Sequence, residues 1–503
     1  MKDIIFYFFG NAVIFYTAAL VLCYIIMSVA SFVSTTYNRT IYIEKHDLEA
    51  LNSSPFTPGV SIVSPAYNEE LNIVDNVNSF LMQNYPKFEV IIVNDGSKDQ
   101  TLEKLIENFE LMEVPYRYNE LIHAAPFKRL FRSTNPKYHR LTVVDKVNGG
   151  TKADAINAGI NVARYPWFVN TDVDCILPVN AIYRCINVVL RHRNVTAISA
   201  AMTMSNGCTV KDGQIQDRRC SWSPLPMFQT LEYMRSFFLG KMAWSTINAL
   251  PNVSGGFGFL NTKMVIEAGG YDGSSFAEDM EMLLSLLRYT HDNDKPYRVI
   301  QIPYTACWTE GPSTMKILYR QRKRWASGLV QCLRQHSDLI GKPRYGLTGM
   351  ITLPYMVLFE LLAPIIEFSG FLFTIYLAFI GAVNWQTAIV IFASIYLFSF
   401  SVNMVVMVID WICGSTFDRK REYIKCVVAA ILEPIVYHPI IVYCSIRGYL
   451  FMLMGKELKW GEMTRRRHQT GQATAGEAAS GEKGEQAEQT QEQTQTTQPS
   501  SEA

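Results

Sequence analysis

Two groups of carboxylates in this chain have the spacing that metal-assisted or acid–base chemistry requires. The triplet Asp172-Val173-Asp174 directly follows a short apolar run, WFV at 167–169. One of these carboxylates could bind a divalent cation while the other meets a sugar or a ribose. A site with few, hard oxygen ligands suits Mg²⁺ or Mn²⁺ that also contacts phosphates. A second such triplet, at 292–294, is expected in a solvated loop.

The other group, Glu278-Asp279, stands at the beginning of an apolar helical run, EDMEMLLSLL. Acidic residues are common there because their charge complements the positive end of the helix dipole. The same two side chains could also take part in proton transfer. These residues alone leave both interpretations open.

The elements that would position these residues alternate between strand and helix. Short β-branched or aromatic runs predict strands at 60–64, 89–93, 141–144 and 167–169. Helical patterns follow the first two of them, at 71–83 and 100–111. This alternation predicts an α/β fold with a mostly parallel sheet and helices on both faces. Ligands bind at the carboxyl ends of the strands in such sheets.

Each predicted strand ends in polar, acidic or glycine-rich residues. The segments are SPAYNEE (64–70), VNDGS (93–97), DKVNGGTKADAINAG (145–159) and NTDVD (170–174). Glu69 and Asp95 could accept hydrogen bonds from a base or a ribose. Lys152, together with backbone N–H groups at a helix start, could hold a diphosphate. A nucleotide-binding edge of the sheet is therefore predicted.

These motifs, followed by Gln321-Arg-Lys-Arg324-Trp325, resemble those of the processive membrane glycosyltransferases of family 2. That family includes cellulose, chitin, hyaluronan and poly-N-acetylglucosamine synthases. The resemblance covers roughly residues 58–340 in motif detail and the flanking apolar segments in architecture. It implies a GT-A-like fold and sugar transfer from a nucleotide donor.

The resemblance also implies roles for individual residues. The nucleotide-sugar would be held by Tyr67, Glu69, Asp95, Lys152, Asp172, Gln321 and Arg324. Asp174 would bind the metal, and Gly256 and Trp325 would lie beside the acceptor. The catalytic residues would be Asp279 as general base, Glu278 beside it, and Arg324.

The physical chemistry agrees with these roles. In an inverting transfer a carboxylate takes the proton of the acceptor hydroxyl while that hydroxyl attacks the anomeric carbon. Mg²⁺ or Mn²⁺ and a fixed arginine would stabilise the charge on the departing diphosphate. We expect a UDP-sugar donor, UDP-GlcNAc or UDP-Glc, and a growing, β-linked polysaccharide as acceptor. The alternative is a non-processive enzyme that adds one or a few sugars to a lipid acceptor.

Composition indicates that part of the chain lies in a membrane. The hydrophobic fraction is 49%, and 46 Lys and Arg against 45 Asp and Glu leave no basic excess to indicate nucleic acid as a partner. Long apolar runs occupy 4–33, 347–383, 387–412 and 423–454. Ten cysteines without metal-ligand spacing fit a reduced compartment.

These runs predict the domain organisation. Residues 1–35 would form a transmembrane anchor, 58–340 a cytoplasmic glycosyltransferase domain, and 468–503 a disordered tail. The region 347–455 would contain an interfacial helix, two spans, and an interfacial or re-entrant segment flanked by basic residues. Three crossings of the cell (inner) membrane result, with possible partner subunits or a homo-oligomer completing a polymer path.

Two basic segments have a plainer expected role. The insertion at 114–140 is expected to be a solvated loop, with a membrane-surface location as the alternative. The run of Arg320, Arg322 and Lys323 beside Arg324 is expected to face solvent or lipid headgroups unless it clamps the diphosphate.

Overall fold

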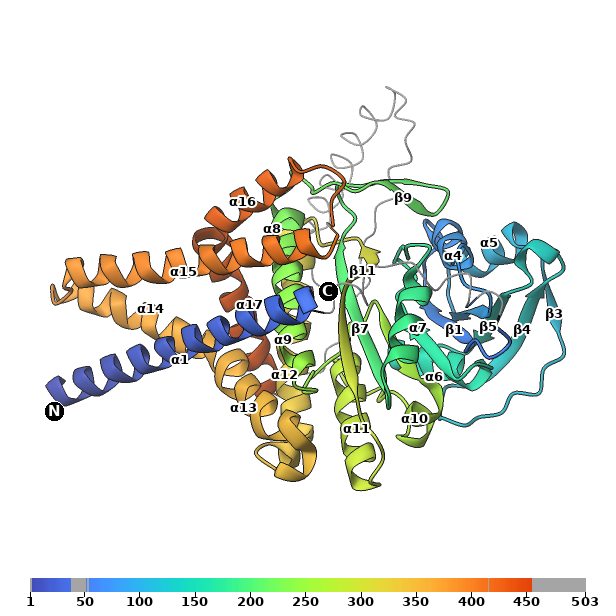
Figure 1. The fold of residues 1–503 in the computed structure, drawn as a ribbon, viewed down its shortest axis with the longest axis horizontal. Helices are drawn as coiled ribbons and strands as arrows, with labels where there is room; N and C mark the ends of the chain where they lie inside the picture. Colours follow the sequence, from blue (N-terminus) through green and yellow to red (C-terminus); the bar gives the residue numbers. More distant parts are fainter. Residues whose placement is uncertain (1, 38–50, 52–53, 415, 455–503) are drawn as a thin grey trace, which may run out of the picture.

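The computed structural model describes residues 2–37, 51, 54–414 and 416–454, so the predicted tail at 468–503 lies outside the described residues. A sheet with its covering helices forms one side of the molecule, and long helices project from the other side (Figure 1). The chain enters through the projecting helix α1 (Lys2–Tyr37) and returns to the projecting group after the sheet is complete.

The central sheet has nine strands in the order β11-β7-β10-β6-β1-β2-β5-β4-β3. β1 pairs in parallel with β2 and β6, whereas β10 is antiparallel to its neighbours β6 and β7. The fold class is therefore confirmed as α/β with a mixed, mostly parallel sheet. The strands are β1 (Val60–Ala66), β2 (Phe88–Asn94), β3 (Leu111–Val114), β4 (Phe127–Ser133), β5 (Leu141–Lys146), β6 (Trp167–Asn170), β7 (Ala197–Met204), β10 (Gly258–Asn261) and β11 (Val299–Thr309). A separate hairpin consists of β8 (Thr209–Lys211) and β9 (Gln214–Asp217).

Alternate residues of the central strands enter two different cores, as the period of a strand requires. In β1, Val60 and Ile62 join one core and Val63 joins the other. The first core includes side chains of α4 (Ile73–Leu81), α5 (Thr101–Asn108), α7 (Ala181–Arg191) and α8 (Pro224–Met234). The second includes α6 (Lys152–Val162), α10 (Thr262–Glu267) and α11 (Glu278–Asp292). Helices therefore cover both faces of the sheet.

The insertion at 114–140 is not simply a solvated loop, which corrects the expectation from the sequence. Residues 127–133 form β4, which lies between β3 and β5 in the sheet. Leu130 and Phe131 are buried, while Lys128, Arg129 and Arg132 are exposed. The strand was not predicted from the sequence because its three basic residues reduce the hydrophobicity of the segment. β4 is also at the far side of the sheet from the projecting helices (Figure 1), so a membrane around those helices would not reach it.

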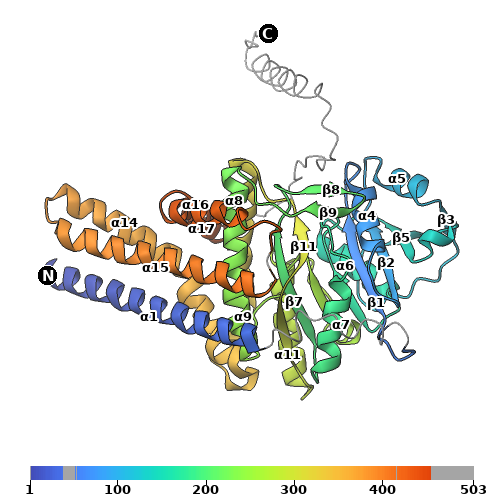
Figure 2. The same ribbon diagram turned by 45° about the horizontal axis from the view of Figure 1, so that its top comes forward.

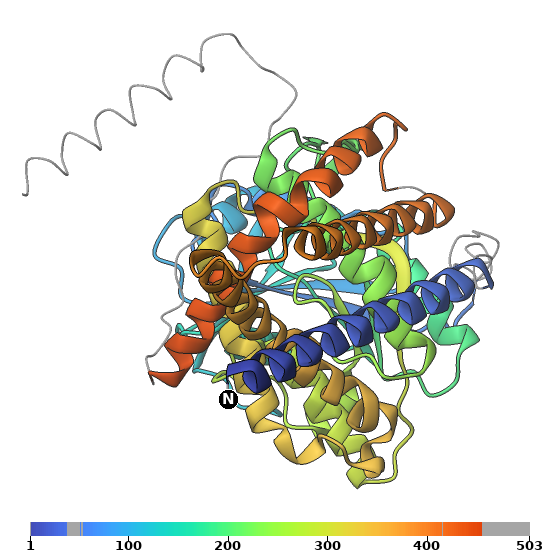
Figure 3. The same ribbon diagram turned by 90° about the vertical axis from the view of Figure 1, so that its left-hand side faces the viewer.

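Among the described residues, four helical stretches are long and apolar enough to cross a membrane: 11–37, 348–379, 385–412 and 422–453. Three of them include helices that project together, namely α1, α14 (Ala363–Phe379) and α15 (Trp385–Ile412) (Figures 1 and 2). The fourth is interrupted, with α16 (Glu422–Leu432), a π-helical turn η7 (Glu433–Tyr437) and α17 (His438–Leu453). α16 and α17 run diagonally across the view in Figure 3. The number of crossings stays a prediction.

Candidate active site

The predicted site residues lie at one edge of the sheet because they follow parallel strands. Ala66 at the end of β1 is level with Asn94 at the end of β2, and Val63 is level with Asn170 at the end of β6. Tyr67, Asp95 and Asp172 follow these three strands. The loops are also tied together, since the backbone N–H of Asp95 donates to the carbonyl of Ala66 at 2.9 Å.

A chain of ion pairs joins four predicted site residues from four separate segments. Lys152 Nζ lies 2.6 Å from Asp172 Oδ1 and 3.6 Å from Glu278 Oε1. Arg324 Nη1 lies 3.7 Å from Glu278 Oε2. Lys152 Nζ also donates to the carbonyl oxygen of Gly255 at 2.8 Å. The end of β6, the starts of α6 and α11, and α12 (Met315–Gln335) therefore converge on Lys152 and Glu278.

Lys152 is the central cation in this series of ion pairs. Burial alone lowers the pKa of Lys152, but the carboxylates of Asp172 and Glu278 outweigh burial, so the pKa is raised overall. The ammonium group therefore stays charged. In this structure it joins two acidic segments, and the expected contact with a diphosphate stays a prediction.

Asp279 lies half-buried at the first turn of α11, with Oδ1 accepting the backbone N–H of Met280 at 2.9 Å. A Cβ atom on Gly255 would lie 3.5 Å from Asp279 Oδ2, so the glycine leaves space in front of that oxygen. Burial and the neighbouring Glu278 raise the pKa of Asp279, and this increase exceeds the lowering by Lys241 and Lys152. A carboxylate with a raised pKa is a better proton acceptor, as a general base requires. The acidic start of α11 therefore lies both at a helix N-terminus and beside Lys152 and Gly255, and the role of Asp279 as general base stays a prediction.

Lys241 is a site residue that the sequence interpretation missed. It ends the π-helical segment η2 (Arg235–Lys241) that continues α8, and it is 9% exposed. Burial lowers the pKa of Lys241 to about 8, although Asp279 and Glu360 act in the opposite direction. The signal in the sequence was a single cation within the apolar run FFLGKMAW.

A possible metal site lies beside the ion-pair chain. One ligand atom each from Asp172, Asp174 and Cys175 lies within 4.8 Å of the others. The two carboxylates suit a hard cation such as Mg²⁺ or Mn²⁺, whereas the Cys175 thiol does not. Asp174 is 8% exposed, and Asp172 is shared with Lys152. The two carboxylates therefore fit the predicted metal, which would compete with Lys152 for Asp172.

Asp95 is held by a lysine that the sequence interpretation also missed. Lys146 Nζ lies 2.5 Å from Asp95 Oδ1 and 2.5 Å from Asp154 Oδ2, and its side chain is fully buried. Asp95 Oδ1 also accepts the backbone N–H of Gly149 at 3.0 Å. The carboxylate is thus fixed in place at the end of β2. Its role in holding the nucleotide stays a prediction.

The helix α12 carries Gln321, Arg324 and Trp325, but its basic run is divided between environments. Arg320 is exposed, whereas Arg322 is 4% exposed and donates two hydrogen bonds to Glu232, each 2.8 Å long. The expectation that the whole run faces solvent or lipid is therefore wrong for Arg322. Its guanidinium also lies 4.2 Å from the ring centre of Trp325, which is 37% exposed.

Glycines bring α12 close to its neighbours on two sides. A Cβ atom on Gly328 would lie 2.7 Å from the Cβ of Ala277, the residue before Glu278. A Cβ atom on Gly448 of α17 would lie 2.7 Å from the Cβ of Ala326. Both distances are too short for any side chain, so α12 packs directly against the start of α11 and against α17.

The structure places Gly255, rather than the predicted Gly256, beside the carboxylates. Gly256 is buried, and a Cβ atom there would lie 2.4 Å from Met202 Cε. Its carbonyl oxygen accepts a hydrogen bond from Thr171 Oγ1 at 2.9 Å. Gly256 is therefore packed against Met202 and Thr171, and Gly255 is the glycine that lies beside Asp279 and Lys152. The predicted contact of Gly256 with an acceptor stays a prediction.

Two family matches cover most of the segments that build this site, although the segment 122–166, which holds Lys146 and Lys152, lies between them. Residues 61–121, from β1 to beyond β3, match the family described as glycosyl transferase family 2. Residues 167–408, from β6 to near the end of α15, match glycosyl transferase family group 2. The chain is a family 2 glycosyltransferase. The predicted membership of family 2 is thereby confirmed, whereas processivity stays a prediction.

The glycosyltransferase is similar to curated polysaccharide synthases. It is 25% identical over 321 residues to the poly-beta-1,6-N-acetyl-D-glucosamine synthase of Staphylococcus epidermidis (strain ATCC 35984), covering 63% of this chain and 65% of that protein. It is 25% identical over 328 residues to the synthase of the same name from Staphylococcus aureus (strain COL), covering 64% and 65%. The similarity thus spans slightly less than two thirds of either relative.

A solved structure shares the fold of the glycosyltransferase. It is the mannosyltransferase PcManGT from Pyrobaculum calidifontis in complex with GDP-Man and Mn²⁺. The TM-score is 0.52 with 17% sequence identity, and the match covers 87% of this chain and 100% of that one. This likeness supports the GT-A-like fold.

Proposed function

We propose that this glycosyltransferase transfers a sugar, with inversion, from a UDP-sugar to a growing polysaccharide at a membrane. The observation that carries the proposal is the position of Asp279, whose Oδ2 faces the space left by Gly255 beside Lys152 and the Glu278–Arg324 pair. The curated relatives named for a β-linked N-acetylglucosamine polymer make UDP-GlcNAc the first donor to test and UDP-Glc the second.

In the proposed reaction, Asp279 takes the proton of the acceptor hydroxyl as the hydroxyl oxygen bonds to the anomeric carbon. The bond between that carbon and the diphosphate oxygen breaks, and UDP leaves with the electron pair. Arg324, held near Glu278, stabilises the negative charge that develops on the diphosphate. Tyr67, Glu69 and Asp95 would hold the nucleotide.

Asp174, with Asp172, would hold a divalent cation, for which the Mn²⁺ bound by the mannosyltransferase neighbour is a precedent. When bound, Mg²⁺ or Mn²⁺ would neutralise part of the diphosphate charge. Trp325 and Gly255 would lie beside the acceptor sugar. α1, α14 and α15 would cross the cell membrane and keep the domain at 58–340 on the cytoplasmic face.

The deciding experiment measures release of the nucleoside diphosphate, UDP or GDP according to the donor, by the full chain in lipid vesicles. The donors are UDP-GlcNAc, UDP-Glc and, for comparison, GDP-Man, each with Mn²⁺, with Mg²⁺ and with EDTA, and the product is sized. We expect turnover of one UDP-sugar that EDTA abolishes and a ladder of increasing length. A single sugar on lipid would replace the polymer assignment by the non-processive alternative, and turnover of GDP-Man alone would overturn the UDP assignment.

Replacing Lys241 by methionine is expected to move the acidic limb of the pH–rate profile to higher pH. Lys241 lowers the pKa of Asp279, so removing its charge lets that pKa rise. A base with a higher pKa loses its active, deprotonated form at a higher pH. Because the pKa of Lys241 is itself lowered to about 8, the difference from the wild type should be largest below pH 8.

The measurement is kcat/KM for UDP release across pH, with Lys263→Met as the control because Lys263 is 82% exposed on α10. An unshifted acidic limb in Lys241→Met, with normal thermal stability, would show that Asp279 does not titrate in this limb.

A further inference from the structure

A pocket lies away from the proposed catalytic residues, between the end of α1 and the sheet domain. It has a volume of about 380 Å³. Its lining comes from α1, α9 (Met242–Thr246), the end of α7 and the start of β11: Ala30, Val33, Ser34, Tyr37, His192, Ser245, Thr246, Arg298 and Ile300. β7 and β11 run parallel to each other and begin at residues 197 and 299, so the pocket lies at their amino ends. Asp172 lies at the carboxyl end of β6, on the opposite edge of the sheet.

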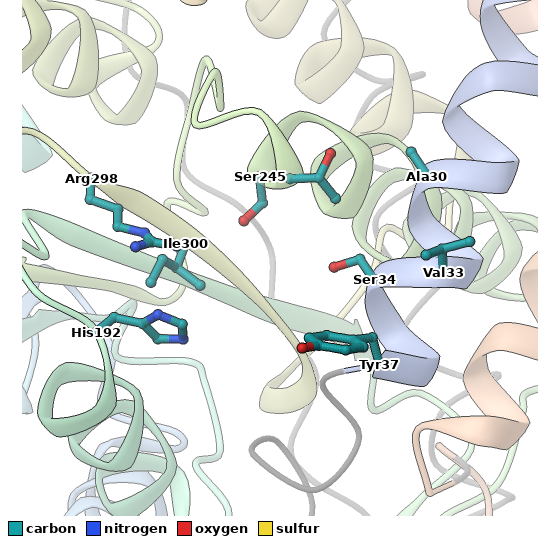
Figure 4. Close-up of a pocket in the computed structure, with 9 residues that line it drawn as sticks. Ala30, Val33, Ser34, Tyr37, His192, Ser245, Arg298 and Ile300 are labelled. Atoms are coloured by element: carbon teal, nitrogen blue, oxygen red, sulfur yellow. The ribbon is translucent and has the colours of Figure 1, made fainter.

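One wall of the pocket is basic. Figure 4 shows Arg298 and His192 on one side, across from Ser34 and Tyr37 of α1. Arg298 is exposed, and Arg191 and Arg193, on either side of His192, are exposed as well. Burial, followed by Arg298 and Arg191, lowers the pKa of His192, so the imidazole is neutral at pH 7 and the positive charge comes from the arginines.

The opposite wall is amphipathic. Ser34 and Tyr37 bring hydroxyl groups from α1, while Ala30 and Val33 of the same helix are apolar. Val33 is 58% exposed and Tyr37 is 86% exposed. A ligand that fits both walls carries an anionic group toward Arg298 and an apolar part along α1.

The position of the pocket identifies the source of such a ligand. The last residues of α1 end a stretch, 11–37, that is long and apolar enough to cross a membrane. Lipid headgroups lie at the end of a membrane-spanning helix, where tyrosine is also enriched. Basic side chains at this depth attract the anionic lipids of the cytoplasmic leaflet.

We propose that this pocket binds the headgroup phosphate of an anionic phospholipid. Arg298 pairs with the phosphate, the hydroxyl groups of Ser34 and Tyr37 donate to its oxygens, and the acyl chains follow the exposed side of α1 near Val33. The bound lipid holds the amino-terminal edge of β11 against the membrane surface. The inference rests on the membrane placement of α1 but not on the identity of the donor or acceptor sugar.

The test measures lipid retention by the purified full chain. The protein is exchanged into detergent micelles that contain phosphatidylglycerol or phosphatidylcholine, and bound lipids are counted by native mass spectrometry. We expect the wild type to retain phosphatidylglycerol over phosphatidylcholine. Arg298→Ala should retain phosphatidylglycerol roughly fivefold less, the effect of one basic side chain at a membrane surface, and Arg298→Lys should recover most of it.

The matched control is Arg132→Ala, because Arg132 is an exposed arginine on β4, far from the projecting helices. Equal retention by Arg298→Ala and Arg132→Ala would overturn the proposal.

A thermal-shift experiment with inorganic phosphate and with glycerol phosphate distinguishes a lipid headgroup from a free phosphate. Stabilisation by these two compounds as large as by phosphatidylglycerol would overturn the lipid assignment. Unchanged melting of Arg298→Ala in phosphatidylcholine shows that it folds. UDP release is recorded separately, so failure of the proposed function cannot be confused with failure to bind lipid.

Discussion

Replacing Asp279 by asparagine is expected to reduce the turnover of the UDP-sugar by about 10²- to 10⁴-fold, the usual contribution of general acid–base catalysis. Asparagine has nearly the same size and can still accept the N–H of Met280, so the first turn of α11 should keep its shape. The side chain can no longer take a proton from the acceptor. Donor binding should therefore change much less than kcat.

Asp294→Asn is the matched control for this experiment. Asp294 is exposed in the loop after α11, and its φ of 51° is a conformation that asparagine adopts readily. We expect wild-type turnover from this variant. An Asp279→Asn protein with more than about one tenth of the wild-type turnover would assign the proton transfer to another group.

Replacing Arg324 by alanine is expected to lower kcat by about 10²- to 10³-fold, as loss of one fixed group that stabilises transition-state charge does elsewhere. The guanidinium lies 3.7 Å from Glu278 and 3.5 Å from the carbonyl of Phe276, so it is held at the site. When the guanidinium is removed, Lys152 is the cation that still lies close to Glu278. The effect should appear in kcat more than in KM.

Arg320→Ala gives a close comparison, because Arg320 lies one turn earlier on α12 and is exposed. The same substitution there removes an equal charge from the same helix without touching Glu278. Steady-state kinetics of the two variants separate a local role from a general effect of charge. Equal losses in both would contradict the role of Arg324, and a normal rate in Arg324→Ala would exclude it.

The sequence predicted which strands carry the site residues at their carboxyl ends, because strands of this kind can be recognised from local sequence patterns. The runs at 60–64 and 89–93 are β-branched and bounded by turn residues, and they appear as β1 and β2 with slightly longer bounds. Parallel pairing then brings Asp95 and Asp172 to one edge. β4 was not predicted because its basic residues mask the hydrophobic pattern of the two side chains that enter the core.

Other site features depend on contacts between distant segments, which local patterns do not encode. Lys241 lies 38 residues before Asp279 in the sequence, and only the folded structure brings its charge close enough to lower the pKa of that carboxyl group. Lys146 and Asp95 are 51 residues apart in sequence, and Arg322 and Glu232 are 90 apart. Nothing near Arg322 distinguishes it from the exposed Arg320. Such pairs appear only when the helices have been placed.

The contacts of Gly328 and Gly448 bear on how the molecule can be divided. α12 packs against the start of α11, which carries the proposed base Asp279, at Gly328, and against α17 at Gly448. Arg322 inside α12 also donates to the hydroxyl of Tyr437, which follows the sheet domain by about a hundred residues of chain. A soluble fragment cut at residue 340 would leave this side of α12 open to water and Arg322 without that partner. We therefore expect the segments on the two sides of residue 340 to unfold together, so that a fragment ending there is less stable than the full chain.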